Sequence, residues 1–338
     1  MSLWVGVLAW LLGSFSHIGA LAQPVGLQVA NATVAATGID RWLMRLHEAP
    51  RSCAYVGTFV VTVGSDMSSS RIWHVGNGQR QMERVEALTG TPRTTFRLND
   101  EVVTFLQDSR TIVHEKREAL DLFPNLLNRA DASVKRLYRL RMLGQGRVAG
   151  LEADIAQLLP IDKLRYGYQI WTDQKTGMMI KLQTLDASGN VLEQAAFSEL
   201  ELDAPVTMSK LKSMMDDTKG YRVVRPHLVQ TTADQEGWFL STTVPGFAPV
   251  RCYKRLEGDG PTAEEILQCV FTDGLASVSL FVEPFDASRH ARMLTHNQMS
   301  IGATSLHVRH LAKWWLTAVG EVPPQTLVTF VQAFERKH

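Results

Sequence analysis

The chain has 338 residues, of which 45% are hydrophobic and 20% charged, and its 35 basic residues nearly balance its 34 acidic ones. This balance gives no overall attraction to nucleic acid or to an anionic membrane, so we expect no nucleic-acid partner. The composition is that of a globular protein, and the length allows two domains.

The first 22 residues predict a secretory signal peptide. They contain no Lys, Arg, Asp or Glu, are mostly apolar and end in the triplet Ala20-Leu21-Ala22, which is an A-x-A cleavage pattern. The apolar run is shorter than the ~20 residues that span a bilayer, which favours cleavage over the alternative, a retained membrane anchor. We therefore expect residues 1–22 to be removed from an exported protein and residues 23–37 to form a flexible N-terminus.

Residues 38–203 predict a first domain that consists of one helix followed by many strands. Apolar side chains recur at helical spacing within 38–48, at Ile39, Trp42, Leu43 and Leu46. From residue 55 to 63 the period changes to two, as in a strand. Further strands are predicted at 70–75, 79–87, 93–98, 101–107 and 110–116 and, after a loop or short helices at 120–132, at 136–143, 151–158, 165–172, 178–186 and 191–202. Short turns join these strands, for example at Asn99-Asp100, which is typical of an antiparallel meander or barrel.

Residues 204–225 are predicted to link this domain to a second one at 226–338. The linker contains a short helix, whose apolar residues are Met208, Leu211, Met214 and Met215. The second domain has strand patterns at 250–256, 267–272, 276–283, 305–311 and 313–319. It ends in a helix that follows Pro323-Pro324 and carries Leu327, Phe330, Val331 and Phe334 on one face. The predicted fold class is therefore α+β, mainly β.

The three cysteines predict one disulfide. Cys252 and Cys269 lie 17 residues apart in strand-like segments, and in an oxidising compartment they are the natural pair. Closing such a loop stabilises a protein by roughly 3 kcal/mol in the chain-entropy model. Cys53 is left over, either buried or free for intermolecular pairing. A zinc site is the alternative, but the chain has no C-x-x-C pair, so we expect no metal.

No sequence motif of an active site is present. The chain lacks the nucleophile elbow, the P-loop, the zincin motif and the dinucleotide-binding glycine pattern. His307 and His310 lie three apart on a predicted strand and so point to opposite faces. Asp273 and Ser277 lack a third member of a triad, and Asp273-Gly274 is more simply a turn. We expect no enzymatic activity and no cofactor, with an exported hydrolase as the alternative.

Six segments, in one order, resemble the RseB/MucB family, which comprises periplasmic negative regulators of the envelope-stress sigma factor. The resemblance runs from about residue 38 to 336 through both predicted domains. The segments are YVGTFV at 55–60, RYGYQIW at 165–171, VLEQAAFSEL at 191–200, LSTTVPGF at 240–247, FTDGLAS at 271–277 and GEVPPQT at 320–326.

The resemblance implies a fold, a location and a partner. The first domain would be similar to the lipoprotein carriers LolA and LolB, which have a curved, unclosed antiparallel barrel with helices, and the second would be a smaller antiparallel sheet with a helix. The protein would lie in the periplasm and bind the periplasmic segment of a membrane-spanning anti-sigma factor of the RseA/MucA kind. It would protect that segment from regulated proteolysis until lipid or lipopolysaccharide displaces it.

The resemblance also implies a lipid site in the apolar concavity of the first domain. The candidate residues are Trp42, Leu43, Phe59, Val61, Phe96 and Phe105. The alternative for each is an ordinary core position. We expect the anti-sigma factor on the second domain and the linker, and a homo-oligomer is compatible with the sequence. The alternative function is a periplasmic carrier of lipid or lipoprotein, which would have no need of the second domain.

Overall fold

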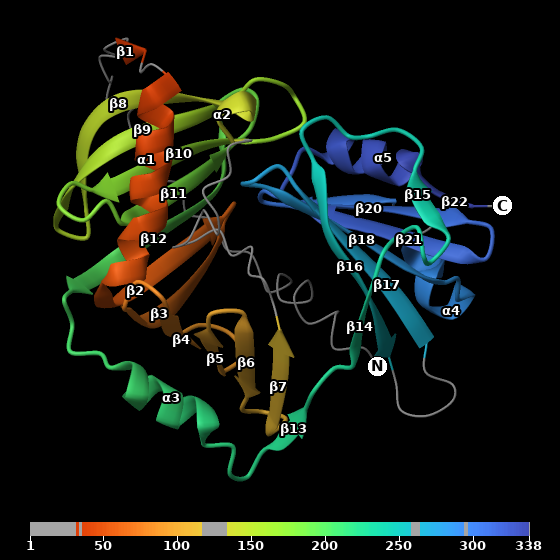
Figure 1. The fold of residues 1–338 in the computed structure, drawn as a ribbon, viewed down its shortest axis with the longest axis horizontal. Coiled ribbons are helices and arrows are strands. Elements are labelled where there is room, and N and C mark those ends of the chain that lie inside the picture. Colours follow the sequence, from red (N-terminus) through yellow and green to blue (C-terminus); the bar gives the residue numbers. More distant parts are fainter. Residues whose placement is uncertain (1–31, 34–35, 117–133, 258–263, 294–296, 338) are drawn as a thin grey trace.

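The protein, described here by a computed structural model, has two β-sheet bodies that lie side by side (Figure 1). The model describes residues 32–33, 36–116, 134–257, 264–293 and 297–337. The predicted signal peptide, most of the predicted flexible N-terminus and the predicted loop at 120–132 lie outside the described residues. In the part of the chain that is described, no helix has the length and hydrophobicity needed to cross a membrane.

The first body is a curved sheet of 13 strands that does not close into a barrel. Its strand order is β1-β8-β9-β10-β11-β12-β2-β3-β4-β5-β6-β7-β13, and all neighbours are antiparallel except β7 and β13. The strands are β1 (Ala32–Thr33), β2 (Ala54–Val63), β3 (Asp66–Gly76), β4 (Gln81–Ala87), β5 (Arg93–Leu98), β6 (Glu101–Leu106), β7 (Thr111–Lys116), β8 (Tyr138–Val148), β9 (Leu151–Pro160), β10 (Gly167–Asp173), β11 (Met179–Leu185), β12 (Val191–Leu202) and β13 (Arg222–Val224). The prediction of a mainly β, unclosed antiparallel sheet is confirmed.

Helix α1 (Ala36–Glu48) packs across one face of this sheet, as Figure 1 shows. Its apolar positions Ile39, Leu43 and Leu46 share a buried cluster with strand residues such as Leu158 and Tyr168. The apolar face predicted from the helical spacing is therefore the face that packs against the core, as is typical of an amphipathic helix on a sheet.

The segment predicted as a linker is folded onto the first sheet. Thr207 caps helix α3 (Met208–Asp216) by accepting a hydrogen bond from the backbone N–H of Lys210 at 3.3 Å. The helix buries Leu211 and Met215 in a cluster that also contains Phe96 and Phe105. Strand β13 then extends the sheet by pairing in parallel with β7. The predicted boundaries between the first domain (38–203), the linker (204–225) and the second domain (226–338) stay a prediction. In the structure, residues 204–225 pack as part of the first body.

The second body is a sheet of seven strands with the order β14-β16-β17-β18-β21-β20-β19. Helix α5 (Pro324–Ala333) packs on it, and a two-stranded sheet of β15 and β22 lies beside the helix. The strands are β14 (Leu228–Thr231), β15 (Trp238–Leu240), β16 (Ala248–Glu257), β17 (Glu264–Thr272), β18 (Ser277–Pro284), β19 (Gln298–Ile301), β20 (Thr304–Leu311), β21 (Trp314–Gly320) and β22 (Phe334–Arg336). Phe330 and Phe334, two residues of the predicted helical face, are fully buried among Trp238, Phe271 and Leu280. The expected smaller antiparallel sheet with a helix is confirmed, and the body has a further short helix, α4 (Ala287–His290).

Cys252 and Cys269 face each other on β16 and β17 and are joined as a disulfide. Their Cα atoms are 4.1 Å apart. The thiol of Cys53 is half-buried, and burial, aided by the nearby charge of Asp203, raises its pKa to about 11. That thiol is thus protonated and unreactive at neutral pH.

We predict that non-reducing peptide mapping will find Cys252 and Cys269 in one cross-linked peptide. Replacing both by alanine should lower the free energy of unfolding by roughly 3 kcal/mol, because the unfolded chain regains the entropy of the open loop. The matched control is Cys53→Ala, which should change the stability far less. Recovery of both Cys252 and Cys269 as free thiols would contradict the pairing.

Candidate functional site between the two domains

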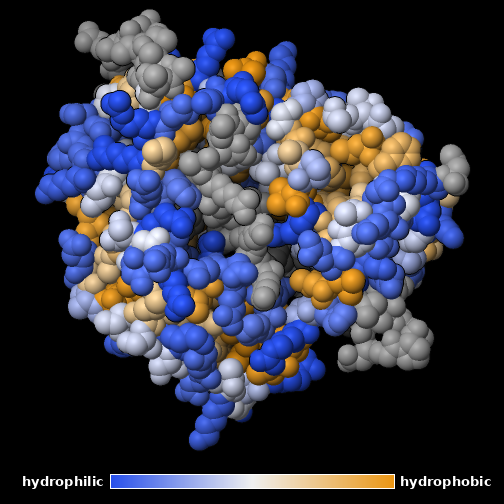
Figure 2. All heavy atoms as spheres, in the orientation of Figure 1, coloured by the Kyte–Doolittle hydropathy of each residue, from blue (hydrophilic) through white to orange (hydrophobic). Residues whose placement is uncertain are grey.

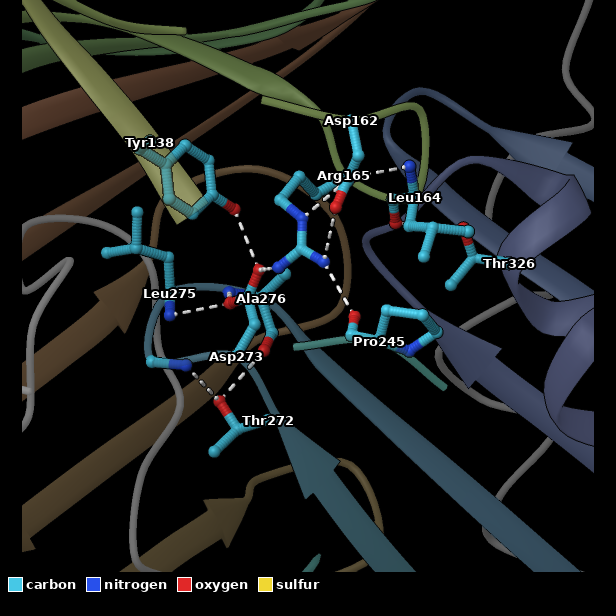
Figure 3. Close-up of polar contacts among 11 residues, drawn as sticks. Tyr138, Asp162, Leu164, Arg165, Pro245, Thr272, Asp273, Leu275, Ala276 and Thr326 are labelled. Atoms are coloured by element: carbon cyan, nitrogen blue, oxygen red, sulfur yellow. Dashed lines mark hydrogen bonds and ion pairs between the residues drawn. The ribbon is translucent and has the colours of Figure 1, made fainter. Parts of the chain in front are cut away.

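The two bodies are joined by a polar cluster that we call the clasp: Tyr138, Asp162, Arg165, Pro245 and Asp273 (Figure 3). Arg165 lies in the turn between β9 and β10 of the first body, and its side chain is completely buried. Its Nη1 donates to Oδ2 of Asp273 at 2.8 Å, and its Nη2 donates to the carbonyl oxygen of Pro245 at 2.8 Å. Both acceptors belong to the second body, so one guanidinium holds two of its loops.

Asp162, three residues before Arg165 in the same turn, orients the guanidinium. Its two carboxylate oxygens accept from Nε at 2.9 Å and from Nη2 at 3.1 Å, a bidentate arrangement. Burial by itself lowers the pKa of Arg165, but the contacts with Asp162 and Asp273 outweigh burial, so the pKa is raised. Arg165 is therefore a fixed cation inside the interface.

Asp273 is fully buried in the turn between β17 and β18, and four hydrogen-bond donors stabilise its carboxylate. Oδ1 accepts from the backbone N–H groups of Leu275 at 2.9 Å and Ala276 at 2.7 Å, while Oδ2 accepts from Arg165 and from the hydroxyl of Tyr138 at 2.9 Å. Burial raises the pKa of Asp273, and these donors oppose that rise. The turn predicted at Asp273-Gly274 is present, but the sequence did not show that its carboxylate faces another domain.

Tyr138 begins strand β8 and supplies a neutral donor from the first body. Burial, together with the nearby Tyr168 and Asp273, raises the pKa of its hydroxyl well above the ordinary value. The hydroxyl therefore stays protonated and can donate to Asp273 at any physiological pH. The Arg165 guanidinium also lies near the faces of two rings, 6.0 Å from the ring centre of Tyr138 and 5.1 Å from that of Phe247.

Apolar side chains are exchanged across the same interface. Leu275 of the second body is buried in the cluster beneath α1, whereas Leu164 of the first body packs against the core of the second. The hydroxyl of Thr326 in α5 donates to the carbonyl oxygen of Leu164 at 2.8 Å. Packed side chains thus surround the buried ion pair of Arg165 and Asp273, whereas Asp162 is partly exposed.

Close approach of the backbone at Gly246 is needed to close the clasp. A Cβ atom there would lie 2.8 Å from Nη2 of Arg165 and 2.8 Å from Cδ2 of Leu137, and the residue has φ +79. Only glycine combines that conformation with that space. The Pro-Gly-Phe segment at 245–247 therefore has a structural reason for its glycine.

A second contact between the bodies lies at the turn between β19 and β20. The N–H of Ala303 donates to Oε2 of Glu193 on β12 at 3.3 Å. Gly302 lies against Val63, where a Cβ atom would be 2.6 Å from Cγ1 of the valine. Burial raises the pKa of Glu193, and the Ala303 N–H opposes the rise.

The geometry of the clasp is that of a structural contact between the two bodies. Each Asp273 oxygen is occupied by two donors, and Ser277 is not among them. The residues that the structure describes contain no group of three or more His, Cys, Asp or Glu side chains suited to a metal ion. What the cluster can do is fix the relative position of two sheets, or release them if its charges are separated.

The six predicted lipid-binding residues do not come together in one site. Trp42 and Leu43 pack in the cluster beneath α1. Phe59 packs edge-on against Phe197 with ring centres 6.2 Å apart, and Val61 is half-buried further along β2. Phe96 and Phe105 are buried 5.5 Å apart in the cluster covered by α3. Their role in lipid contact stays a prediction.

The sequence reasoning did not identify the clasp residues as a site. Arg165 and Asp273 each lie in one of the segments that carry the family resemblance, at 165–171 and 271–277. Their place in these segments could have marked them as candidate site residues, because each is a charged residue next to an apolar strand.

Two family models match the chain in order. The MucB/RseB N-terminal domain matches residues 39–215, and the MucB/RseB C-terminal domain matches residues 232–335. The sigma factor AlgU regulatory protein MucB of Pseudomonas aeruginosa is 30% identical over 307 residues, which cover 88% of this chain and 90% of that protein. The sigma-E factor regulatory protein RseB of Escherichia coli K12 is 23% identical over 302 residues, which cover 88% and 89%.

Solved structures give the same result. The crystal structure of MucB in complex with MucA(peri) is 25% identical, covers 88% of this chain and 98% of its own, and has a TM-score of 0.64. The MucA/MucB complex of Pseudomonas aeruginosa is also 25% identical, covers 89% and 99%, and has a TM-score of 0.66.

We predict that Asp273→Asn will lower the free energy of unfolding by about 3 kcal/mol, since it removes the charge that neutralises buried Arg165 from the second body while Asp162 still neutralises it in part. Chemical denaturation would measure this loss. Hydrogen exchange should also speed up on both sides of the clasp, at 161–166 and 273–276.

The matched control for this variant is Asp186→Asn. Asp186 also accepts backbone N–H groups in a turn, from Ser188 and Asn190 at 2.8 Å each, but its turn is exposed. The control should change stability much less. Equal losses in the two variants would mean that turn capping, and not the contact between the bodies, explains the effect.

Proposed function

Because this chain belongs to the MucB/RseB family, we propose that it binds the periplasmic segment of a membrane-spanning anti-sigma factor and thereby restrains an envelope-stress sigma factor. The observation that carries the proposal is the ordered match of both family domains over 39–215 and 232–335. MucB, whose structure resembles this chain over both bodies, has been solved in complex with MucA(peri), which supports a partner of that kind.

The two-body architecture suits a partner that is a flexible segment. Such a segment orders when it binds and therefore needs a surface that is already fixed. The clasp provides this by holding the second body against the first through Arg165, Asp273 and Tyr138. We place the partner on the second body and on the segment 204–225, which the first sheet holds in position.

We further propose that the bound protein protects the anti-sigma segment from regulated proteolysis. The fraction of the anti-sigma segment that is protected equals the fraction that is bound, because a bound segment cannot enter the active site of a protease. The protein would act without enzymatic chemistry and without a cofactor, in the periplasm, after removal of residues 1–22.

Release by lipid or lipopolysaccharide would complete this switch. A lipid that binds one arrangement of the bodies better than another shifts the population by its difference in affinity, and a few kcal/mol is enough. The candidate residues form separate clusters: Trp42 with Leu43 beneath α1, and Phe96 with Phe105 beneath α3. A lipid chain at either place would have to displace packed side chains. Figure 2 shows several separate hydrophobic patches on both bodies, with hydrophilic residues between them.

A carrier of lipid or lipoprotein is the second candidate function. It is favoured only by the curved, unclosed first sheet, which could enclose a ligand. The clasp argues for the regulator, because a carrier would gain nothing from a buried ion pair that fixes a second body.

We predict that mature protein, residues 23–338, will bind a fluorescently labelled periplasmic segment of the cognate anti-sigma factor saturably in an anisotropy titration. Lipopolysaccharide should weaken this binding, and a scrambled segment should not bind. Binding that lipopolysaccharide leaves unchanged would remove the lipid switch and keep the regulator. Absence of segment binding, with lipid retained, would favour the carrier.

A further inference from the structure

The second contact between the bodies is made by a hairpin tip of the second body, residues 302–303. Ile301 pairs with Thr304, so Gly302 and Ala303 form a two-residue loop between β19 and β20, and φ is +59 at Gly302, as in a type II′ turn. Ala303 is completely buried, although β19 is the last strand of its sheet. The hairpin tip is therefore covered by the first body, where Gly302 lies against Val63.

Glu193 on β12 meets the hairpin tip with a half-buried carboxylate that has few partners. Its Oε2 accepts one hydrogen bond, from the N–H of Ala303 at 3.3 Å. Among the described residues it forms no ion pair with a cation. The carboxylate of Asp273 in the clasp has four donors, one of them a guanidinium. The two acids between the bodies thus differ in how well the protein stabilises their charge.

The side chains that neighbour Glu193 in the sheet are uncharged. Thr184 on β11 and Val63 on β2 are its direct partners in register. Beyond Thr184 in the same row lies Tyr168, which is fully buried, and burial raises the pKa of its hydroxyl well above the ordinary value. Beyond Val63 lies Asp66, which is exposed to solvent. The hairpin tip, which covers Glu193 from the second body, also has no charged side chain.

A protonated Glu193 fits this contact better than an ionised one. Burial raises the pKa of Glu193, and the N–H of Ala303 opposes the rise only in part. A neutral carboxyl group also has a proton to donate. The hydroxyl oxygen of Thr184, directly opposite in register, is shielded from solvent and has no hydrogen-bond partner among the described residues, so it can accept that proton.

We propose that Glu193 and the hairpin tip form a proton-controlled latch between the two bodies, which is tight when the carboxyl group is protonated and loose when it is ionised. The latch shares no residue with the clasp. The bodies are therefore held at two places in acid and chiefly by the clasp at higher pH. This inference does not rest on the proposed partner.

The direction of the pH dependence follows from the sign of the pKa shift. The pKa of Glu193 is raised in the folded protein. The stabilisation that the latch contributes is therefore complete below the ordinary pKa of a glutamic acid and is lost as the pH rises through the raised pKa.

The test is hydrogen exchange of the mature protein, residues 23–338, measured by mass spectrometry on peptides that contain the hairpin tip. Protection at pH about 5 is compared with protection at pH about 8, after correction for the intrinsic pH dependence of exchange. We expect the hairpin tip to be protected at least threefold better at the lower pH. Equal protection of the wild-type tip at the two pH values, or better protection at the higher one, would overturn the proposal.

Glu193→Gln assigns the effect to this side chain, because glutamine has the shape of the neutral acid and cannot ionise. In this variant the hairpin tip should be protected at both pH values as it is in the wild type at the lower one. The matched control is Glu199→Gln, the same change at an exposed position of β12, which should keep the wild-type pH dependence. Thermal melts verify that both variants are folded. A pH dependence that persists in folded Glu193→Gln would equally contradict the latch.

Discussion

A buried guanidinium has to be neutralised, and the architecture of this protein follows from how Arg165 meets that requirement. Leaving such a charge unpaired in the interior costs several kcal/mol, so its partners are fixed as firmly as a packed core is. Asp162 provides one partner from the same loop, but Asp273 and the Pro245 carbonyl come from the other sheet. The charge is therefore fully paired only when the two bodies are together.

This requirement explains several features that look unrelated in the sequence. Gly246 is needed because a side chain there would occupy the space of the guanidinium. The exchange of Leu164 and Leu275 keeps water out and so strengthens the ion pair. Thr326, at the start of the final helix, is tied to the same loop. These contacts together hold the two bodies in one relative position.

The sequence predicted the parts of the fold that have a period. The apolar face of α1, the long strands and the last helix were found because repeated spacing exposes them. Strands of three or four residues, such as β13 and β15, are too short to show a period, and β3 begins at Asp66 because a tight turn at Gly64-Ser65 starts the strand earlier than its alternation suggests. The clasp was not predicted, because pairing between Arg165 and Asp273, 108 positions apart, leaves no trace in one sequence. The six lipid candidates were chosen because they are apolar residues of the first domain. Such residues fall in several clusters, because different helices, such as α1 and α3, pack on different parts of the large curved sheet.

The central claim is that the clasp fixes the relative position of the two bodies, and a distance measurement between them tests it most directly. Spin labels at Met67→Cys in the first body and Val250→Cys in the second, both exposed positions, in a Cys53→Ala background, would report that distance by electron double resonance. We predict one narrow distribution for the wild-type clasp and a broad or shifted one for Arg165→Met. An unchanged narrow distribution in a folded Arg165→Met protein would contradict the claim.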